Sequence, residues 1–295
     1  MIDFQYATNG PVSQGFSLSN FVMGVRGDFA PQTRYTAALG QTRDVAGVQL
    51  PFLLARQATI DFERLNDSNT MIRVGLFRPM LNPQWSQWLT GVPDYFGSHS
   101  ALLLGEQIGF EGAYVCDSRA FELRVGLTNG NGIFGLNTNN ARALHGFFRS
   151  TSHWSSVLLD WGTSVYTFRQ SAPGGANYRE NWASNLFAYM QFPRLWVRLG
   201  VELLWGNFLD ADSDVFARGW AAQAFLPFLG HELLIRAEHL EGSPAYDGRH
   251  FKQFQIGPAF YPSSKMTVFL LQQYVEPGVS AGEVTTFARL RMELP

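Results

Sequence analysis

Apolar residues in this chain recur at every second position over long stretches. In residues 195–206 every odd position is apolar, whereas the even positions include Arg198, Gly200 and Glu202. Residues 121–128 and 284–294 alternate in the same way, and over the three segments one face is apolar at 15 of 16 positions and the other at 3 of 15. Successive side chains of a β-strand point to opposite faces, whereas a helix would spread the charges around its whole surface. The alternation therefore predicts strands with one apolar and one polar face.

Composition narrows the kinds of all-β protein that fit. Charged residues make up 16% of the 295 residues, against about 25% in an average soluble protein, while aromatic residues reach 15%. The sequence has no run of about 18 apolar residues that would predict a transmembrane helix. Few charges, many aromatic residues and 29 glycines are typical of a transmembrane β-barrel, whose hydrophobicity is hidden in the alternation.

Charge and cysteine content exclude several functions. The net charge of −2 and the pI near 6.3 argue against a nucleic-acid partner. A single cysteine, Cys116, excludes a disulfide framework and a cysteine-based zinc site. We expect neither a metal nor another cofactor. Residues 1–5 lack the basic and apolar regions of a secretory signal, so any export signal is expected to be absent from this chain.

Strand-like segments come at regular spacing along the whole chain. Sixteen are expected, an even number, as single-chain bacterial barrels require. No linker or shift in composition divides the chain, so residues 1–295 are expected to form a single transmembrane β-barrel domain. The expected strands are residues 2–9, 19–30, 33–42, 50–63, 70–79, 104–116, 119–129, 141–150, 154–168, 180–192, 194–207, 215–226, 231–241, 250–261, 264–276 and 282–294.

Short and long connections alternate between these segments, as in outer-membrane barrels with short periplasmic turns and longer external loops. The sequence therefore predicts an all-β fold, a transmembrane antiparallel up-and-down β-barrel of about 16 strands. It would be integral to the bacterial outer membrane, with both termini periplasmic. A soluble β-sandwich also alternates, but Greek-key connections do not give such regular spacing. The longer connections are residues 43–48, 79–103, 128–140, 169–180, 207–214, 241–249 and 276–282.

The segment Arg73-Val74-Gly75-Leu76-Phe77-Arg78-Pro79 resembles a strand-end motif of the phosphate-selective porin O/P family. A long loop, a glycine-rich strand at 104–110 and a strand ending in Asn129-Gly130 follow in the same order. The resemblance covers about residues 20–150 and implies a 16-stranded channel of Gram-negative bacteria, commonly trimeric, whose third external loop folds inward. Residues 79–103 would be that loop. The chain departs from the family in having only two lysines, Lys252 and Lys265, and no terminal aromatic residue.

Inward-facing charges at mid-strand are the candidate functional residues of such a barrel. Sixteen strands enclose a lumen too wide for side chains to fill, which favours a water-filled passage over a plugged one. The third loop holds a single charge, so it would narrow the passage by bulk. The expected pore-lining residues are Arg34, Arg73, Arg124, Arg198, Glu202, Arg236, Arg289 and Arg291, and the expected constriction-loop residues are Trp85, Trp88, Asp94 and Tyr95.

These features predict a channel, or porin, for passive diffusion of small hydrophilic solutes or ions. A modest arginine excess, with Arg289 and Arg291 opposed locally by Glu293 alone, predicts a weak preference for anions. The alternative is a barrel that serves as scaffold or conduit subunit of a larger outer-membrane complex. Expected partners are the lipid bilayer, small solutes or ions, and a homotrimer or other subunits of a membrane complex. We expect no enzymatic activity, since His153 beside Ser155 and Ser156, with His145 one strand earlier, is a triad candidate of a kind that arises by chance.

Overall fold

The protein is built of antiparallel β-strands. The computed structural model describes residues 2–9, 13–41, 54–64, 69–77, 79, 107–116, 120–129, 142–171, 178–209, 214–243, 249–263, 266–276 and 283–292. No helix within these ranges is long and apolar enough to cross a membrane. The described strands are β1 (Ile2–Asn9), β2 (Ser13–Ala30), β3 (Thr33–Gln41), β4 (Leu54–Glu63), β5 (Thr70–Phe77), β6 (Gln107–Val115), β7 (Phe121–Thr128), β8 (Ala143–Trp154), β9 (Val157–Ser171), β10 (Tyr178–Phe192), β11 (Val197–Leu209), β12 (Asp214–Phe228), β13 (His231–Ser243), β14 (Arg249–Ser263), β15 (Met266–Glu276) and β16 (Glu283–Met292).

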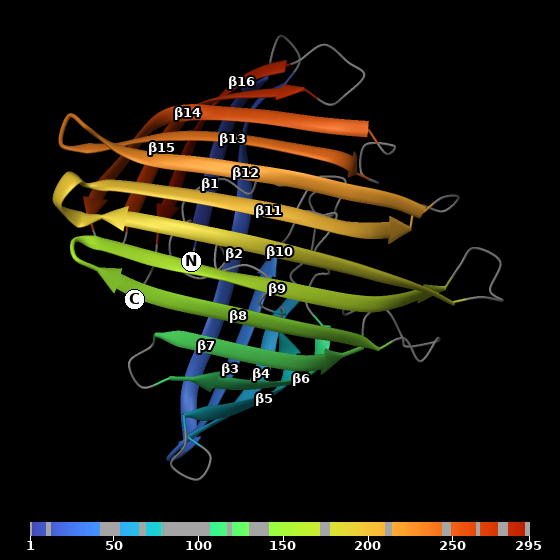
Figure 1. The fold of residues 1–295 in the computed structure, drawn as a ribbon. Helices are drawn as coiled ribbons and strands as arrows, with labels where there is room; N and C mark the ends of the chain where they lie inside the picture. Colours follow the sequence, from blue (N-terminus) through green and yellow to red (C-terminus); the bar gives the residue numbers. More distant parts are fainter. Residues whose placement is uncertain are drawn as a thin grey trace.

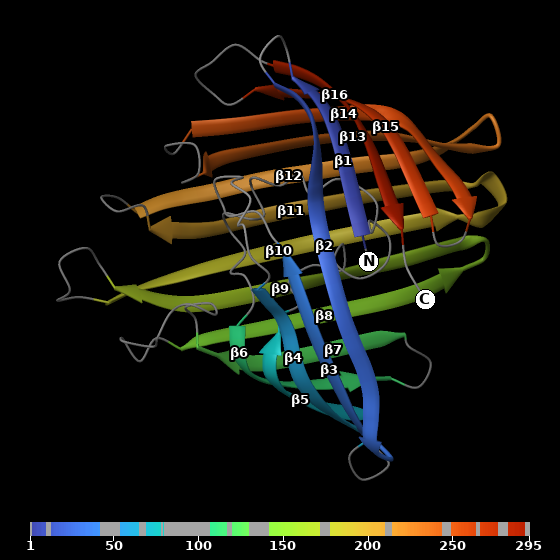
Figure 2. The same ribbon diagram turned by 180° about the vertical axis from the view of Figure 1, so that it is seen from behind.

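These strands close into a barrel. Each strand pairs with its neighbours in sequence, and the first pairs with the last, with Ile2 opposite Met292 and Asn9 opposite Thr285. In Figure 1, β7–β14 run side by side across the front, while β1–β5 cross behind them at a steep angle. Figure 2 shows the same barrel from behind, with β1 and β2 beside β15 and β16. The predicted up-and-down barrel and its strand number are therefore confirmed.

The sequence placed every strand, and the differences lie at strand ends. Residues 151–153 were expected to connect two strands, but β8 continues to Trp154 and the chain reverses at Ser155 and Ser156. Ser155 has φ 54°, and the connection between β12 and β13 has φ 47° at Leu229 and φ 79° at Gly230. Tight hairpin turns use positive φ because it matches the twist of the strands they join. The connections at Ser155–Ser156 and at Leu229–Gly230 thus form tight reversals at one end of the barrel.

The two faces of the wall differ as the alternation predicts. Val201 and Leu203 on β11 are 43% exposed, whereas the alternate residues Glu202 and Leu204 are buried. The buried positions of successive strands lie on one common side of the wall, which faces the inside of the barrel. The exposed positions therefore form its outer surface. Its large apolar residues include Ile60, Ile72, Val74, Ile108, Phe110, Leu123, Val125, Leu144, Trp161, Val165, Leu186, Trp220, Phe254 and Leu270.

The inner face is polar only in part, and this departs from the simple expectation of an outward-apolar, inward-polar wall. A cluster of buried apolar and aromatic side chains lines the inner face of β8, β10 and β12–β15. Phe187 lies between Phe147 and Tyr189, with ring centroids 6.0 and 5.7 Å apart. We call these residues the inner apolar cluster: Phe147, Phe187, Tyr189, Phe225, Leu234, Ala259, Phe269 and Leu271.

Candidate functional site

The charged residues of the inner face are joined by ion pairs from strand to strand. Asp61 on β4 lies directly opposite Arg73 on β5, and Arg73 lies directly opposite Glu111 on β6. The Arg73 guanidinium donates two hydrogen bonds to Asp61, Nε to Oδ1 at 2.8 Å and a terminal nitrogen to Oδ2 at 3.0 Å. This fork geometry is the strong form of an arginine–carboxylate pair. The strand register therefore brings together charges that the sequence holds far apart.

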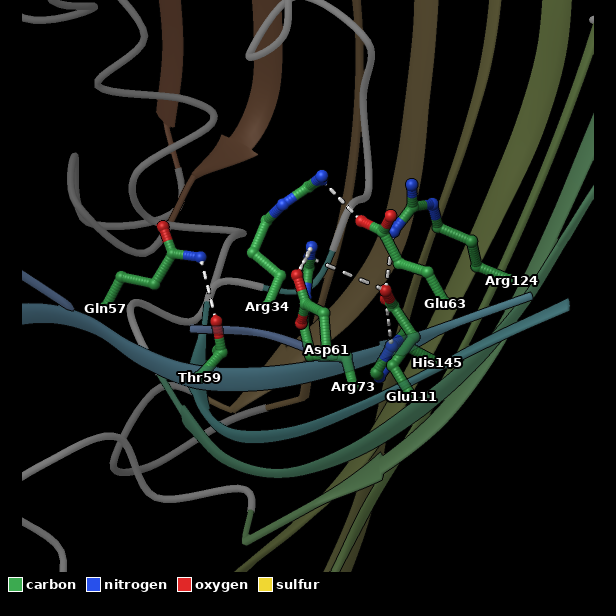
Figure 3. Close-up of polar contacts among 9 residues, drawn as sticks. All are labelled: Arg34, Gln57, Thr59, Asp61, Glu63, Arg73, Glu111, Arg124 and His145. Carbon is green, nitrogen blue, oxygen red and sulfur yellow. Dashed lines mark hydrogen bonds and ion pairs between the residues drawn. The ribbon is translucent and has the colours of Figure 1, made fainter. Parts of the chain in front are cut away.

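Glu111 is the centre of this group, as Figure 3 shows. One carboxylate oxygen accepts a hydrogen bond from Arg124 on β7 at 2.7 Å and lies 3.8 Å from Arg73. The other oxygen lies 3.0 Å from Nε2 of His145 on β8. Arg124 also pairs with Glu122 on its own strand. Glu111 is 1% exposed, so these partners replace the water that the carboxylate lost on burial.

A glycine makes room for the histidine of this group. Gly126 on β7 lies directly opposite His145, and a Cβ at position 126 would collide with the imidazole ring. The edge of Phe77 packs against the ring, with centroids 6.1 Å apart. The imidazole is thereby fixed with Nε2 at the Glu111 carboxylate, while its buried Nδ1 has no hydrogen-bond partner among the described residues.

The ion pairs continue on both sides of this centre. Arg34 on β3 pairs with Asp28 on β2 and with Glu63 on β4, beside a cavity of about 230 Å³. On the other side, Arg149 on β8 donates to both carboxylate oxygens of Asp160 on β9, at 2.8 and 2.6 Å. Among the described residues these pairs form three groups that follow one another from β2 to β9, and together we call them the ion-pair belt: Asp28, Arg34, Asp61, Glu63, Arg73, Glu111, Glu122, Arg124, His145, Arg149 and Asp160.

A neutral group of hydrogen bonds adjoins the belt. The amide of Gln107 on β6 donates to the hydroxyl of Tyr166 on β9 at 2.8 Å. The amide oxygen of Gln107 also accepts a hydrogen bond from Thr128 on β7. All three side chains are buried. The inner face of β6–β9 is therefore held by polar contacts that cross more than one strand.

The remaining pore-lining candidates with described side chains lie on the opposite part of the wall. Arg198 on β11 pairs with Glu232 on β13, and its guanidinium carbon lies 4.1 Å from the centre of the Phe225 ring. Arg236 Nε lies 3.2 Å from the Glu238 carboxylate, and both side chains are buried. Glu202 accepts a hydrogen bond from the hydroxyl of Tyr189. Of all the pore-lining candidates with described side chains, three belong to the ion-pair belt, namely Arg34, Arg73 and Arg124. The other three, Arg198, Glu202 and Arg236, do not.

The side chains of two groups of sequence-predicted candidates lie outside the described residues. Arg289 and Arg291 lie on β16, where the register sets Gln5 and Asp3 of β1 opposite them, but their side chains are outside the described residues. The constriction-loop candidates Trp85, Trp88, Asp94 and Tyr95 also lie outside the described residues.

Sequence reasoning missed two members of the belt, Arg149 and His145. Both follow the alternation of β8, in which residues 143, 145 and 147 are buried and residue 144 is exposed. The parity of that strand was therefore sufficient to place them inside. His145 was considered only as a partner for a serine nucleophile, together with His153. Among the described residues, no hydrogen bond joins either histidine to a serine; His145 contacts Glu111 instead.

Comparison with known proteins identifies the fold of the chain but does not assign the chain to a family. No family model matches the chain, and no curated protein matches its sequence. The fold is similar to the trimer form of OmpT, an outer membrane protein of Vibrio cholerae, with TM-score 0.63, 10% identity and coverage of 99% of this chain and 97% of that one. An anion-selective porin from Comamonas acidovorans gives TM-score 0.62, 12% identity and coverage of 98% and 96%. The outer membrane channel DcaP of Acinetobacter baumannii gives TM-score 0.61 and 10% identity, with coverage of 99% of this chain and 94% of that one. The chain therefore has the transmembrane β-barrel fold of outer-membrane porins over its full length.

Proposed function

We propose that this protein is a channel of the Gram-negative outer membrane through which small hydrophilic solutes or ions diffuse passively. The observation that carries the proposal is a closed sixteen-stranded wall, apolar outside, with the ion-pair belt on its inner face. A wall of this strand number surrounds a space wider than side chains fill. Several carboxylates of the belt are buried against the wall, but the side chains of Arg34, Arg73 and Arg149 stay 21–29% exposed. Partly exposed guanidiniums suit a wall that borders water, since full burial of both charges would carry a large desolvation cost. The short connections and both termini are proposed to lie on the periplasmic side.

The proposed channel discriminates weakly, with a slight preference for anions. The described arginines among the pore-lining candidates each have an acidic partner, so their fields largely cancel at a distance. The preference is assigned to Arg289 and Arg291, and the register at the seam sets one acidic position, Asp3, opposite Arg291. Salt screens charges over about 8 Å at physiological ionic strength, which further limits selectivity in a wide lumen.

Residues 79–103 are proposed to fold inward as the constriction. The support comes from the wall itself: the side chains of Phe147, Phe187 and Phe225 on the inner face are 3% exposed or less. A segment of the chain that lies against this part of the wall would account for the burial. Residues 79–103 combine several aromatic side chains with one charge, which suits packing on an apolar surface.

Conductance in planar lipid bilayers tests the channel directly. Purified, folded protein is added to a bilayer in potassium chloride, and stepwise increases in an ohmic current are expected. Swelling of liposomes in a pentose sugar gives the matching measurement for a neutral solute. Absence of both signals from protein that shows the heat-dependent gel shift of a folded barrel would contradict the proposal.

A second function is favoured by the inner apolar cluster. Apolar side chains on the inner face suit a lumen occupied by protein, as in a scaffold or conduit subunit of a larger outer-membrane complex. Purification from the native membrane separates the two functions. Trimers of this chain alone favour the porin, whereas stoichiometric partner chains together with no conductance favour the scaffold.

A further inference from the structure

A group of charged side chains lies on the outer surface of the barrel. On β12 and β13 the inner-face residues Ala221 and Glu238 are buried. Because successive residues of a strand alternate between faces, Trp220 and His239 face outward. Register and alternation place further residues of β12–β15 on the same face. We call this group the outer charged patch: Arg218, Trp220, His239, Glu241, Lys252, Tyr274 and Glu276.

The charges of the patch are paired across neighbouring strands. Arg218 lies directly opposite Glu241, and its Nε donates a hydrogen bond of 2.6 Å to that carboxylate. His239 Nε2 lies 3.2 Å from the other oxygen of Glu241. His239 is in turn directly opposite Lys252, whose Nζ lies 3.5 Å from Glu276. The patch is thus one continuous group and not isolated charges.

The position of the patch on the wall is unusual. Among the described residues, every ion pair between outward-facing side chains lies in this patch. A charge on the lipid-facing surface is costly at the bilayer mid-plane and tolerated near the interface. The patch occupies the parts of β12–β15 nearest the longer connections, beside the exposed rings of Trp220 and Tyr274. Such rings are typical of headgroup level. The patch therefore lies at the headgroups of the leaflet on that side.

The geometry of Arg218 leaves it ready to bind an anion. Glu241 engages Nε alone, so the two terminal nitrogens have no partner among the described residues, and the side chain is 70% exposed. A guanidinium presents such nitrogens as a fork that fits two phosphate oxygens. Lys252, 49% exposed, adds a second positive charge two strands away. Together they supply donors for a phosphate group at the membrane surface.

The two glutamates of the patch restrict which phosphate compound fits. Glu241 and Glu276 place negative charge beside both cations, which disfavours inorganic phosphate. Their oxygens accept hydrogen bonds, so a ligand with hydroxyl groups next to its phosphate would satisfy both kinds of side chain. Aromatic rings such as Trp220 offer an apolar surface to the rest of a headgroup. A phosphorylated sugar attached to a lipid has the phosphate, the hydroxyl groups and the apolar part that these side chains would contact.

We propose that the outer charged patch binds the phosphate of a phosphorylated glycolipid headgroup in the outer leaflet, with Arg218 and Lys252 as the phosphate-binding residues. The inference rests on the proposed membrane location and orientation but not on conduction. Lipopolysaccharide is the probe, titrated onto the detergent-solubilised full chain with a chelator present to prevent metal bridges. Native mass spectrometry counts the bound lipid, and phosphatidylglycerol and inorganic phosphate serve as competitors.

The double variant Arg218→Gln/Lys252→Gln is expected to bind lipopolysaccharide at least about tenfold more weakly. The control Arg64→Gln/Arg194→Gln removes two exposed cations outside the patch and is expected to bind like the unchanged protein. Glu241→Gln/Glu276→Gln removes the repulsion but keeps an oxygen that accepts hydrogen bonds from the sugar, and it is expected to bind more tightly. Inorganic phosphate is expected not to displace the lipid.

Several outcomes would overturn the proposal. Unchanged binding in both patch variants would show that the patch does not bind this lipid. Displacement by phosphate or by phosphatidylglycerol at equal concentration would show that the sugar plays no part. A change of oligomeric state without a change in lipid binding would make the patch an interface between copies. Loss of conductance with intact lipid binding would contradict the proposed channel and leave this inference standing.

Discussion

Asp61 and Arg73 face each other directly across β4 and β5 and share two hydrogen bonds, of 2.8 and 3.0 Å. Asp61 is 5% exposed, so its charge depends on this partner. Arg73 also lies 3.8 Å from Glu111. The pair therefore belongs to the group centred on Glu111 and extends that group to β4.

Asp61→Asn is expected to destabilise the barrel. The change removes one charge of a buried pair and leaves the other without its partner, which costs about 3 kcal/mol in other proteins. The free energy of unfolding is measured by urea titration in detergent micelles or liposomes. Lys252→Gln, in the exposed pair with Glu276, serves as control and is expected to cost less than about 1 kcal/mol. Equal losses for the two variants would show that the belt contributes no more than a surface pair.

Gly126→Ala is expected to disturb the imidazole of His145. A methyl group at position 126 would occupy the space of the ring, and overpacking of this kind costs about 1–3 kcal/mol. Gly112→Ala is the matched control, because the nearest atom to a Cβ there is Val125 O at 3.9 Å. The same urea titration compares the two. A larger loss for Gly112→Ala would contradict the placement of the histidine.

Val201→Arg tests which face of the wall meets lipid. Val201 is 43% exposed on β11, and an arginine at the bilayer mid-plane costs about 2–4 kcal/mol. Leu229→Arg, at the tight turn between β12 and β13, is expected to cost about 0–1 kcal/mol, as near the interface. The free energy of unfolding, measured for each variant in liposomes, gives both costs. Similar costs at the two positions would mean that the outer face of β11 does not contact lipid.

The alternation of apolar residues predicted the barrel because it depends only on neighbouring positions in one strand. Val201 and Glu202 reveal their faces without any knowledge of β10 or β12. For the same reason the sequence placed Arg73, Arg124 and Arg198 on polar faces. Strand ends were less accurate, as at Trp154, because the last residues of a strand lack a clear periodic pattern.

Partnerships between strands were beyond the sequence. The contact of Glu111 with His145 depends on the register of three strands and on the space left by Gly126. The alternation places Gly200 on the polar face of β11, but it does not show that a Cβ there would lie 2.6 Å from the ring of Tyr189. Such a contact is set by tertiary packing, which no periodicity encodes.

Arg289→Ala with Arg291→Ala is expected to reduce the proposed anion preference. The reversal potential across a bilayer in a potassium chloride gradient is expected to be small and anionic for the unchanged protein, to shift toward zero in the variant, and to fade as salt rises. Asp3→Asn should have the opposite effect, since the register places it opposite Arg291. A cationic reversal potential for the unchanged protein would contradict the proposal. Strong block by phosphate would support the phosphate specificity of the resembled family.

Deletion of residues 84–98 is expected to increase single-channel conductance if residues 79–103 narrow the lumen. The deletion removes Trp85, Trp88, Asp94 and Tyr95 together. Deletion of residues 131–139, in another long connection, is the control and is expected to leave conductance unchanged. Equal conductance for both deletions, with the barrel still folded, would contradict an inward constriction.

Because β1 pairs with β16, the barrel closes only when its last strand is in place. Until residues 283–292 are present, both β1 and the growing strand carry unpaired backbone groups, and a lipid interior offers no water to satisfy them. A chain that stops short of the last strand therefore has nothing stable to insert. Stable insertion is therefore expected to require residues 283–292, since only they satisfy the backbone groups at that edge of β1. Membrane entry of this protein is thus timed by the end of the chain.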